Sequence, residues 1–287
     1  MHTMRRAGWM VLITLTFVAW GVWTAVLQQF PDEVLKVSFL DVGQGDAVFI
    51  QSPAGNQMLI DGGADRTVLR RLADEMPWYD RTIDVILATH PDTDHVGGLF
   101  DVLGRYEVSY IFRPGIQHDA PAAQSLLLQI AKEKKGGAQE VLARRGQVID
   151  LGGGVYVEIL FPDRNVSGIE TNTGSIVLRV VYGDTAFMLT GDSPQSIEEY
   201  LVGIDSTHLE STVLKIGHHG SRTSSSVAFV GYVSPQYGVL SRGCDNSYGH
   251  PHKEVVDLLG RLEIRVVDTC EEGTITFISD GEIVSKI

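Results

Sequence analysis

The run Thr89-His-Pro-Asp-Thr-Asp-His-Val-Gly-Gly98 carries more structural information than any other segment of this chain. It directly follows an apolar segment, residues 83–88, that is typical of a buried strand. Four potential metal ligands fall within it: His90, Asp92, Asp94 and His95. A helix would scatter them around its circumference and a regular strand would split the last two, but a tight turn with proline and glycines can bring all four together. The run therefore predicts a metal centre at the carboxyl edge of a sheet.

Further residues of the types that bind metals follow other predicted strands. Asp192 ends the sequence Leu-Thr-Gly-Asp after an apolar segment, and His218 and His219 come directly after another. A third cluster, Tyr-Gly-His-Pro-His, contains His250 and His252. A single histidine is more often structural than metal-bound. With the run at residues 89–98 counted as the first cluster, these clusters hold six of the nine histidines, so together they favour one shared site.

Six motifs occur in a fixed order: Phe39-Leu-Asp-Val-Gly-Gln-Gly-Asp46, Asp61-Gly-Gly63, Thr89 to Gly98, Thr190-Gly-Asp192, His218-His-Gly-Ser221 and Asn246-Ser-Tyr-Gly-His-Pro-His252. Together they resemble the metallo-β-lactamase superfamily of binuclear metallohydrolases. More narrowly, they resemble the C-terminal hydrolase domain of bacterial competence DNA-uptake channels. The order of strands and helices alone predicts only a mixed α/β fold, and the resemblance implies its αββα sandwich. That channel carries many membrane spans, so the resemblance implies hydrolase chemistry and says little about DNA transport.

The resemblance also implies two divalent metal ions with defined ligands. The superfamily's first motif is usually His-x-His-x-Asp-His, and here Asp92 replaces the second histidine. The implied ligands are His90 and Asp92 for metal one, Asp94, His95 and His218 for metal two, and Asp192 as the bridge between them. Asn172 or water would complete metal one. The added carboxylate makes the ligand set harder, so we expect Mn²⁺ or Zn²⁺ with a preference for Mn²⁺.

Other residues of the motifs are expected to support catalysis. Asp46 and Asp61 resemble residues that orient metal-bound histidines, although turn formation in glycine-rich loops would also explain them. The predicted catalytic residues are Asp94, His219 and His250. The predicted substrate-binding residues are His219, Ser221, Asn246, His250 and His252. Lys215 is interpreted as a packing or solvated lysine in preference to one that reaches substrate.

The N-terminal segment suggests a membrane anchor. Residues 7–27 contain no charged side chain, and 21 residues at a rise of ~1.5 Å reach about 31 Å, enough for a hydrocarbon core of ~30 Å. Arginines precede the segment and acidic residues follow it, which places the N-terminus in the cytoplasm. We therefore predict a cytoplasmic tail (1–6), a single-pass anchor in the bacterial cytoplasmic membrane (7–28) and an extracytoplasmic hydrolase domain (34–287).

Two other interpretations of this segment stay open. A cleaved signal peptide needs small residues spaced like Ala-x-Ala, but residues 22–25 place a tryptophan in that pattern. A buried first helix of a cytosolic protein is disfavoured because the segment has no polar face.

Charge and cysteine content constrain the partners. The net charge is −13 and no basic run occurs, which argues against tight binding of long nucleic acids through the protein surface. Metal ions can still supply positive charge at a site. Cys244 and Cys270 are compatible with a disulfide outside the membrane or with two reduced thiols.

The leading functional hypothesis is a metal-dependent phosphodiesterase that cleaves single-stranded DNA with a hydroxide held between two ions. An alternative substrate is a cell-envelope phosphodiester, such as a choline-phosphate ester on teichoic acid. A β-lactamase is disfavoured by Asp92 and by the nuclease-like motifs. The non-enzymatic alternative is a metal-binding assembly or DNA-capture module.

Overall fold

The computed structural model describes residues 2–27 and 34–287. The chain divides into two compact units, residues 1–33 and 34–287. The smaller unit contains helix α1 (His2–Leu27), and its described side chains are those of residues 8–23. Within the part of the chain that the structure describes, no helix has both the length and the apolarity needed to cross a membrane. The anchor predicted over residues 7–28 is therefore not confirmed, and residue 28 lies outside the described residues.

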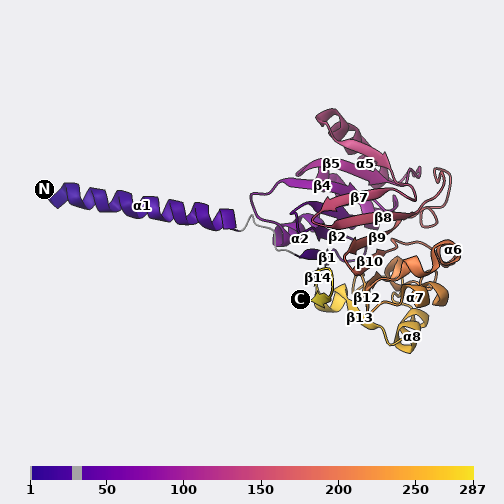
Figure 1. Ribbon diagram of the computed structural model, residues 1–287. Helices are drawn as coiled ribbons and strands as arrows, with labels where there is room; N and C mark the ends of the chain where they lie inside the picture. The colour runs from indigo at the N-terminus through magenta and orange to yellow at the C-terminus, as the bar shows by residue number, and fades with distance from the viewer. Residues whose placement is uncertain (1, 28–33) are drawn as a thin grey trace. The chain divides into compact units, whose positions relative to one another are not determined.

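The larger unit is built on two β-sheets (Figure 1). The first sheet has the strand order β15-β14-β1-β2-β3-β4-β5-β6, with bounds Val284–Lys286, Ile275–Ser279, Leu35–Phe39, Val48–Gln51, Gln57–Ile60, Thr82–Leu87, Glu107–Arg113 and Gln139–Leu142. From β3 to β6 the neighbouring strands are parallel, and the remaining pairs are antiparallel. The parallel strands place their carboxyl ends at one edge of the sheet.

The second sheet repeats this mixed pattern. Its order is β13-β12-β11-β10-β9-β8-β7, with bounds Arg265–Asp268, Tyr237–Leu240, Val213–Lys215, Thr185–Leu189, Val177–Tyr182, Val155–Phe161 and Val148–Gly152. The strands from β10 to β13 are parallel, whereas β7 to β10 pair antiparallel. All five residues of β10 are buried, as expected for a strand covered on both faces.

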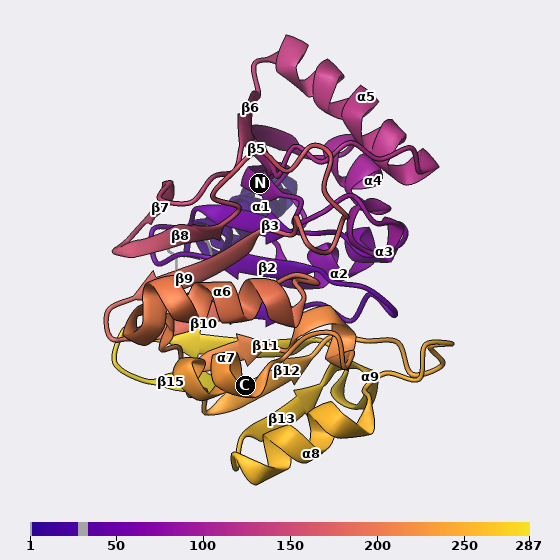
Figure 2. The same ribbon diagram turned by 90° about the vertical axis from the view of Figure 1, so that its right-hand side faces the viewer.

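Three apolar cores hold the layers together. The central core lies between the sheets and combines side chains from both, among them Phe39 and Phe187. The second core packs helices on the outer face of the first sheet, and the third does the same for the second sheet. The helices and 3₁₀ segments are α2 (Thr67–Glu75), α3 (Thr93–Val96), α4 (Leu99–Leu103), α5 (Pro121–Gly136), α6 (Gln195–Asp205), η1 (Ser206–Leu209), η2 (Gly217–Gly220), α7 (Val227–Val233), α8 (Lys253–Arg261) and α9 (Thr269–Glu272). The predicted α/β fold is thus confirmed as an αββα sandwich (Figure 2).

The segment after β4 differs from the predicted tight turn. It contains one turn of helix, α3, with Asp92 at its N-cap, so Asp94 and His95 are helical whereas His90 precedes the helix. Gly98 is required by close packing, because a Cβ atom there would lie 2.2 Å from the carbonyl oxygen of Gly62. The four side chains are therefore brought together by a strand end and the helix that follows it.

Glu198 on α6 holds the segment that leads into α7. Its carboxylate accepts hydrogen bonds from the backbone N–H groups of Ser225 (2.7 Å) and Ser226 (2.6 Å). Ser226 is the N-cap residue of α7, and its hydroxyl accepts from the N–H of Phe229. Burial raises the pKa of Glu198 to about 7, although these backbone donors favour the charged form. A buried acid therefore fixes the chain that follows residues 217–220.

We expect Glu198→Gln to flatten the pH dependence of stability. Because the folded-state pKa of Glu198 is raised from 4.5 to about 7, its contribution is fully present below pH 4.5 and is lost as pH rises through 7. The free energy of unfolding from urea titrations at pH 4, 5, 6, 7 and 8 measures this. The exposed neighbour Glu199→Gln is the matched control, and identical pH profiles for the two variants would contradict the assignment.

Candidate metal centre

The candidate site lies where strands of both sheets end. His90 and His95 follow β4 of the first sheet, whereas Asp192 follows β10 of the second. His218 and His219 belong to η2, directly after β11. Because parallel strands that end together place their following loops at one edge, residues far apart in sequence converge there.

The carboxylate of Asp192 is the centre of this cluster. Its Oδ2 atom faces the Nε2 atoms of four histidines: His95 at 3.3 Å, His219 at 3.5 Å, His218 at 3.6 Å and His90 at 3.9 Å. Burial alone would raise the pKa of Asp192, but His219 and His95 outweigh it and hold the pKa well below its usual range. The carboxylate is therefore charged.

Unpartnered nitrogen atoms show that the cluster fits metal ions. Among the described residues, the buried Nε2 atoms of His90, His95 and His219 have no hydrogen-bond partner. Buried polar atoms nearly always have one, so their convergence on a carboxylate is the arrangement expected of metal ligands. Within residues 2–27 and 34–287, four sets of side chains have ligand atoms within 4.8 Å of one another: His90, His95 and Asp192; Asp94, His95 and His219; Asp46, Asp192 and His219; and Asp46, Asp61 and His95. These nitrogen and oxygen donors suit Zn²⁺ or Mn²⁺.

The histidine pair is arranged differently from the prediction. His219, predicted as a catalytic and substrate-binding residue, is buried, and its Nε2 lies 3.4 Å from Asp94 Oδ2. Its Nδ1 lies 2.8 Å from the carbonyl oxygen of Ser241, which fixes the ring. His218, predicted as a ligand of metal two, keeps 25% of its side chain exposed and contacts Thr223 through Nδ1. The structure thus brings His219, and not His218, into one set with Asp94 and His95.

Both histidines have a left-handed backbone. Their φ angles are +49° for His218 and +54° for His219. Such a conformation costs about 1–3 kcal/mol in a non-glycine residue and is concentrated at functional sites. The strained backbone sends two adjacent side chains to different parts of the site.

Asp61 and Asp46, which were predicted to orient metal-bound histidines, lie beside the Nδ1 atoms of His95 and His219. Asp61 Oδ2 lies 2.8 Å from His95 Nδ1, and Asp61 accepts hydrogen bonds from the N–H (2.8 Å) and the hydroxyl (2.7 Å) of Thr89. Asp46 lies 3.4 Å from His219 Nδ1 and 3.7 Å from His95 Nδ1. A carboxylate on the second ring nitrogen orients a histidine so that its Nε2 faces a metal.

Lys215 has a role that was not predicted from the sequence. Its side chain is 2% exposed, forms an ion pair with Asp46 and donates to the carbonyl oxygen of Gly191 (3.0 Å). It also lies 3.6 Å from Asp192 Oδ1. Burial alone would lower its pKa, but Asp46 and Asp192 outweigh burial and raise it, so the ammonium is charged. In the sequence, this role is indicated by a lysine that stands in an apolar strand shortly before two adjacent histidines.

Gly45 allows the segment of residues 39–46 to approach the backbone of Asp94 closely. A Cβ atom there would lie 2.0 Å from the carbonyl oxygen of Asp94, and the φ angle is +125°. The N–H of Asp46 donates to that same oxygen at 3.2 Å. Glycine at this position therefore places Asp46 against the cluster.

Asp92 lies beside His90 with about a third of its side chain exposed. Its Oδ2 lies 3.7 Å from His90 Nε2 and accepts a hydrogen bond from the hydroxyl of Thr171 (3.1 Å). Asn172, a predicted candidate for metal one, has its Oδ1 3.5 Å from that same hydroxyl. Its role as a ligand stays a prediction.

The predicted substrate residues differ in what they contact. Ser221 accepts a hydrogen bond from the hydroxyl of Thr223 (3.0 Å), and His252 accepts one from the N–H of Arg222 (3.1 Å). The amide of Asn246 bonds to the backbone of its own loop, including the N–H of His250 (2.9 Å). Asn246 therefore shapes the loop, and its predicted substrate contact stays a prediction.

His250 lies beside the cluster as a neutral ring. Its centroid is 5.6 Å from that of His218. Burial, together with the nearby His218, His219 and His252, lowers the pKa of His250 to about 4. Its predicted role in protonating a leaving group stays a prediction.

The comparisons with known proteins agree with this geometry. Residues 40–243 match the sequence profile of the Metallo-beta-lactamase superfamily. The chain belongs to this superfamily. It is 33% identical over 273 residues to Competence protein ComA of Neisseria gonorrhoeae, covering 94% of this chain and 35% of that protein. It is 28% identical over 264 residues to ComE operon protein 3 of Bacillus subtilis, covering 84% of this chain and 33% of the relative.

The superfamily and competence resemblance predicted from the six motifs is thus confirmed. The chain spans about a third of the length of these relatives. Among solved structures, the metallo hydrolase Igni18 from Ignicoccus hospitalis KIN4/I superposes with a TM-score of 0.52 at 14% identity. That superposition covers 84% of this chain and 98% of Igni18, and it supports the superfamily fold.

The two histidines can be separated by their effects on metal binding. We expect His219→Ala to weaken Mn²⁺ or Zn²⁺ binding by more than roughly 100-fold, beyond the loss typical for a residue outside the ligand set. His218→Ala, at the partly exposed neighbour, is the matched variant and is expected to lose less than about tenfold. Calorimetric titration of the metal-free proteins measures both, and circular dichroism checks that each is folded. An equal or reversed order would contradict the assignment of His219.

Proposed function

We propose that this protein is a binuclear metal-dependent phosphodiesterase that cleaves single-stranded DNA. The observation that carries the hydrolase assignment is the convergence of three buried, unpartnered histidine nitrogens on Asp192. Two divalent ions bound there would activate water for attack and neutralise charge on a phosphodiester. Similarity to proteins named as competence proteins supports DNA as the substrate.

The protein groups prepare the site for this reaction. Asp61 and Asp46 orient His95 and His219, while Lys215 balances the buried carboxylates. Asp92 and Asp94 keep about a third of their side chains exposed, at 33% and 32%, so this part of the site is open to a substrate. The added carboxylate of Asp92 supports Mn²⁺ over Zn²⁺.

A cell-envelope phosphodiester is the second candidate substrate. The net charge of −13 disfavours long polyanions and suits a cationic headgroup, such as a choline-phosphate ester. Binding without turnover would instead identify a metal-binding assembly or DNA-capture module.

The function is tested by Mn²⁺-dependent degradation of end-labelled single-stranded DNA. Asp192→Ala is expected to lower the rate by roughly 10²–10³-fold or more, because it removes the charge at the centre of the cluster. Asp257→Ala is the matched control, since Asp257 is an exposed carboxylate on α8 that pairs with Lys253. Absence of cleavage by folded, metal-loaded protein would reject the nuclease, and p-nitrophenylphosphorylcholine then tests the envelope version.

We further propose, from the sequence, that residues 7–28 anchor the protein with residues 34–287 outside the cytoplasm. The uncharged run of residues 7–27 and the arginines before it support this proposal. Within α1, the hydroxyls of Thr14 and Thr16 donate to backbone carbonyl groups one turn earlier, as an apolar environment would require.

The anchor is tested with a C-terminal alkaline phosphatase fusion expressed in bacteria. Active phosphatase in the membrane fraction is the expected result, because this reporter is active only outside the cytoplasm. A C-terminal β-galactosidase fusion is the control. Active β-galactosidase with inactive phosphatase would reject the orientation, and recovery of the fusion protein in the soluble fraction would reject the anchor.

A further inference from the structure

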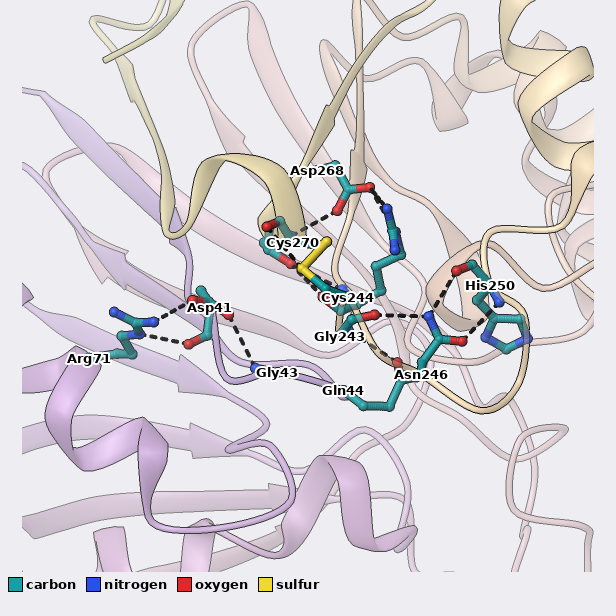
Figure 3. The surroundings of a disulfide bond; sticks show 12 residues. Asp41, Gly43, Gln44, Arg71, Gly243, Cys244, Asn246, His250, Asp268 and Cys270 are labelled. Carbon is teal, nitrogen blue, oxygen red and sulfur yellow. Dashed lines mark hydrogen bonds and ion pairs between the residues drawn. A yellow bond between two sulfur atoms is a disulfide. The ribbon is translucent and has the colours of Figure 1, made fainter.

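The loop between β12 and α8 is held in place by a disulfide and hydrogen bonds (Figure 3). Cys244 forms a disulfide with Cys270 of α9, which settles the state of the two cysteines. The N–H of Gly243 donates to the side-chain oxygen of Gln44 (3.2 Å), in the loop after β1. The loop is therefore tied to both halves of the sandwich.

The Asn246 side chain cross-links the backbone of this loop by hydrogen bonds. Its amide nitrogen donates to the carbonyl oxygens of Gly243 and His250, each at 2.9 Å, and its oxygen accepts from the N–H of His250 (2.9 Å). Figure 3 shows the Asn246 side chain lying between these two residues. Three hydrogen bonds and a disulfide give residues 243–250 one defined shape.

Tyr248 stands at the surface of this fastened loop. Its side chain is 64% exposed, and its ring stacks on that of His250 with centroids 5.6 Å apart and an interplanar angle of 22°. The His250 ring is 6.4 Å from the ring of His219 and 5.6 Å from that of His218. Aromatic rings therefore extend from the buried cluster of candidate metal ligands to an exposed tyrosine.

We propose that Tyr248 is a stacking platform for a nucleobase next to the scissile phosphodiester. This inference rests on the proposed nuclease function and names how the site holds its substrate. Bases stack on aromatic side chains with little regard to sequence, because every base has a flat π-face. Such a contact suits a protein of net charge −13, because stacking does not depend on basic side chains that hold phosphates.

The surroundings favour a base over a quaternary ammonium group. Cationic headgroups are bound by cages in which several aromatic faces surround the charge. Among the rings that lie next to His250 within residues 34–287, Tyr248 is the sole phenylalanine, tyrosine or tryptophan. One open ring supported from behind by a histidine fits a planar partner.

The test compares Tyr248→Ala and Tyr248→Phe of the full chain on two single strands. One strand is normal, and the other carries abasic units on both sides of the cleaved position. On the normal strand, Tyr248→Ala is expected to lower kcat/KM by about 5- to 150-fold, whereas Tyr248→Phe stays within about threefold. On the abasic strand, Tyr248→Ala is expected to match the unmodified protein, because the contact is already absent. Tyr232 on α7 is another exposed tyrosine, so Tyr232→Ala is the control and is expected to leave kcat/KM unchanged on both strands.

Binding distinguishes failure of this inference from failure of the nuclease proposal. Fluorescence anisotropy with the same labelled strands and metal-loaded protein reports the contact whether or not cleavage occurs. Weaker binding of the normal strand alone by Tyr248→Ala supports stacking. An equal loss on both strands, or no loss, overturns it. A loss of p-nitrophenylphosphorylcholine turnover with unchanged DNA binding also overturns it and assigns Tyr248 to a cationic headgroup.

Discussion

Asp192 places a negative charge where water is excluded, and the surrounding structure compensates that charge. A buried, unpaired carboxylate would cost several kcal/mol, so it needs cationic or metal partners. Lys215 supplies one permanent charge, and His95 and His219 approach from other directions. Those rings are in turn held by Asp61 and by the backbone of Ser241. The loops that carry these groups therefore have little freedom to change independently.

Each of the two sheets supplies part of the cluster of candidate metal ligands. The first sheet supplies His90, Asp94 and His95 after one parallel strand, and the second supplies Asp192 and His219 after two others. Rigid strands end at the site, while irregular segments set the final direction of each side chain. The left-handed backbone at residues 218–219 shows how far that direction departs from regular structure. Such a departure persists only because the neighbouring layers hold it.

The sequence was sufficient to predict which loops form the site, because metal-binding residue types follow apolar strands at separated points. It was not sufficient to choose between His218 and His219, since adjacent residues differ only by local backbone angles that no residue pattern encodes. The partner of Lys215 and the disulfide of Cys244 depend on distances across the fold. The edge strands β6 and β15 are short and lack a strong apolar pattern, so the sequence does not indicate them. The αββα sandwich was predicted from the resemblance to the superfamily and not from the periodicity of apolar residues.

The origin of the ligands in both sheets has a consequence for the lifetime of the protein. An ion held jointly by His95 and Asp192 would tether the two halves of the chain. A ligand that binds only the native state stabilises it by mass action, by about 2.7 kcal/mol at a hundredfold excess over Kd. Resistance to proteases would then rise and fall with the supply of transition metal ions. Metal scarcity would thus set how many intact copies survive as well as how fast each one works.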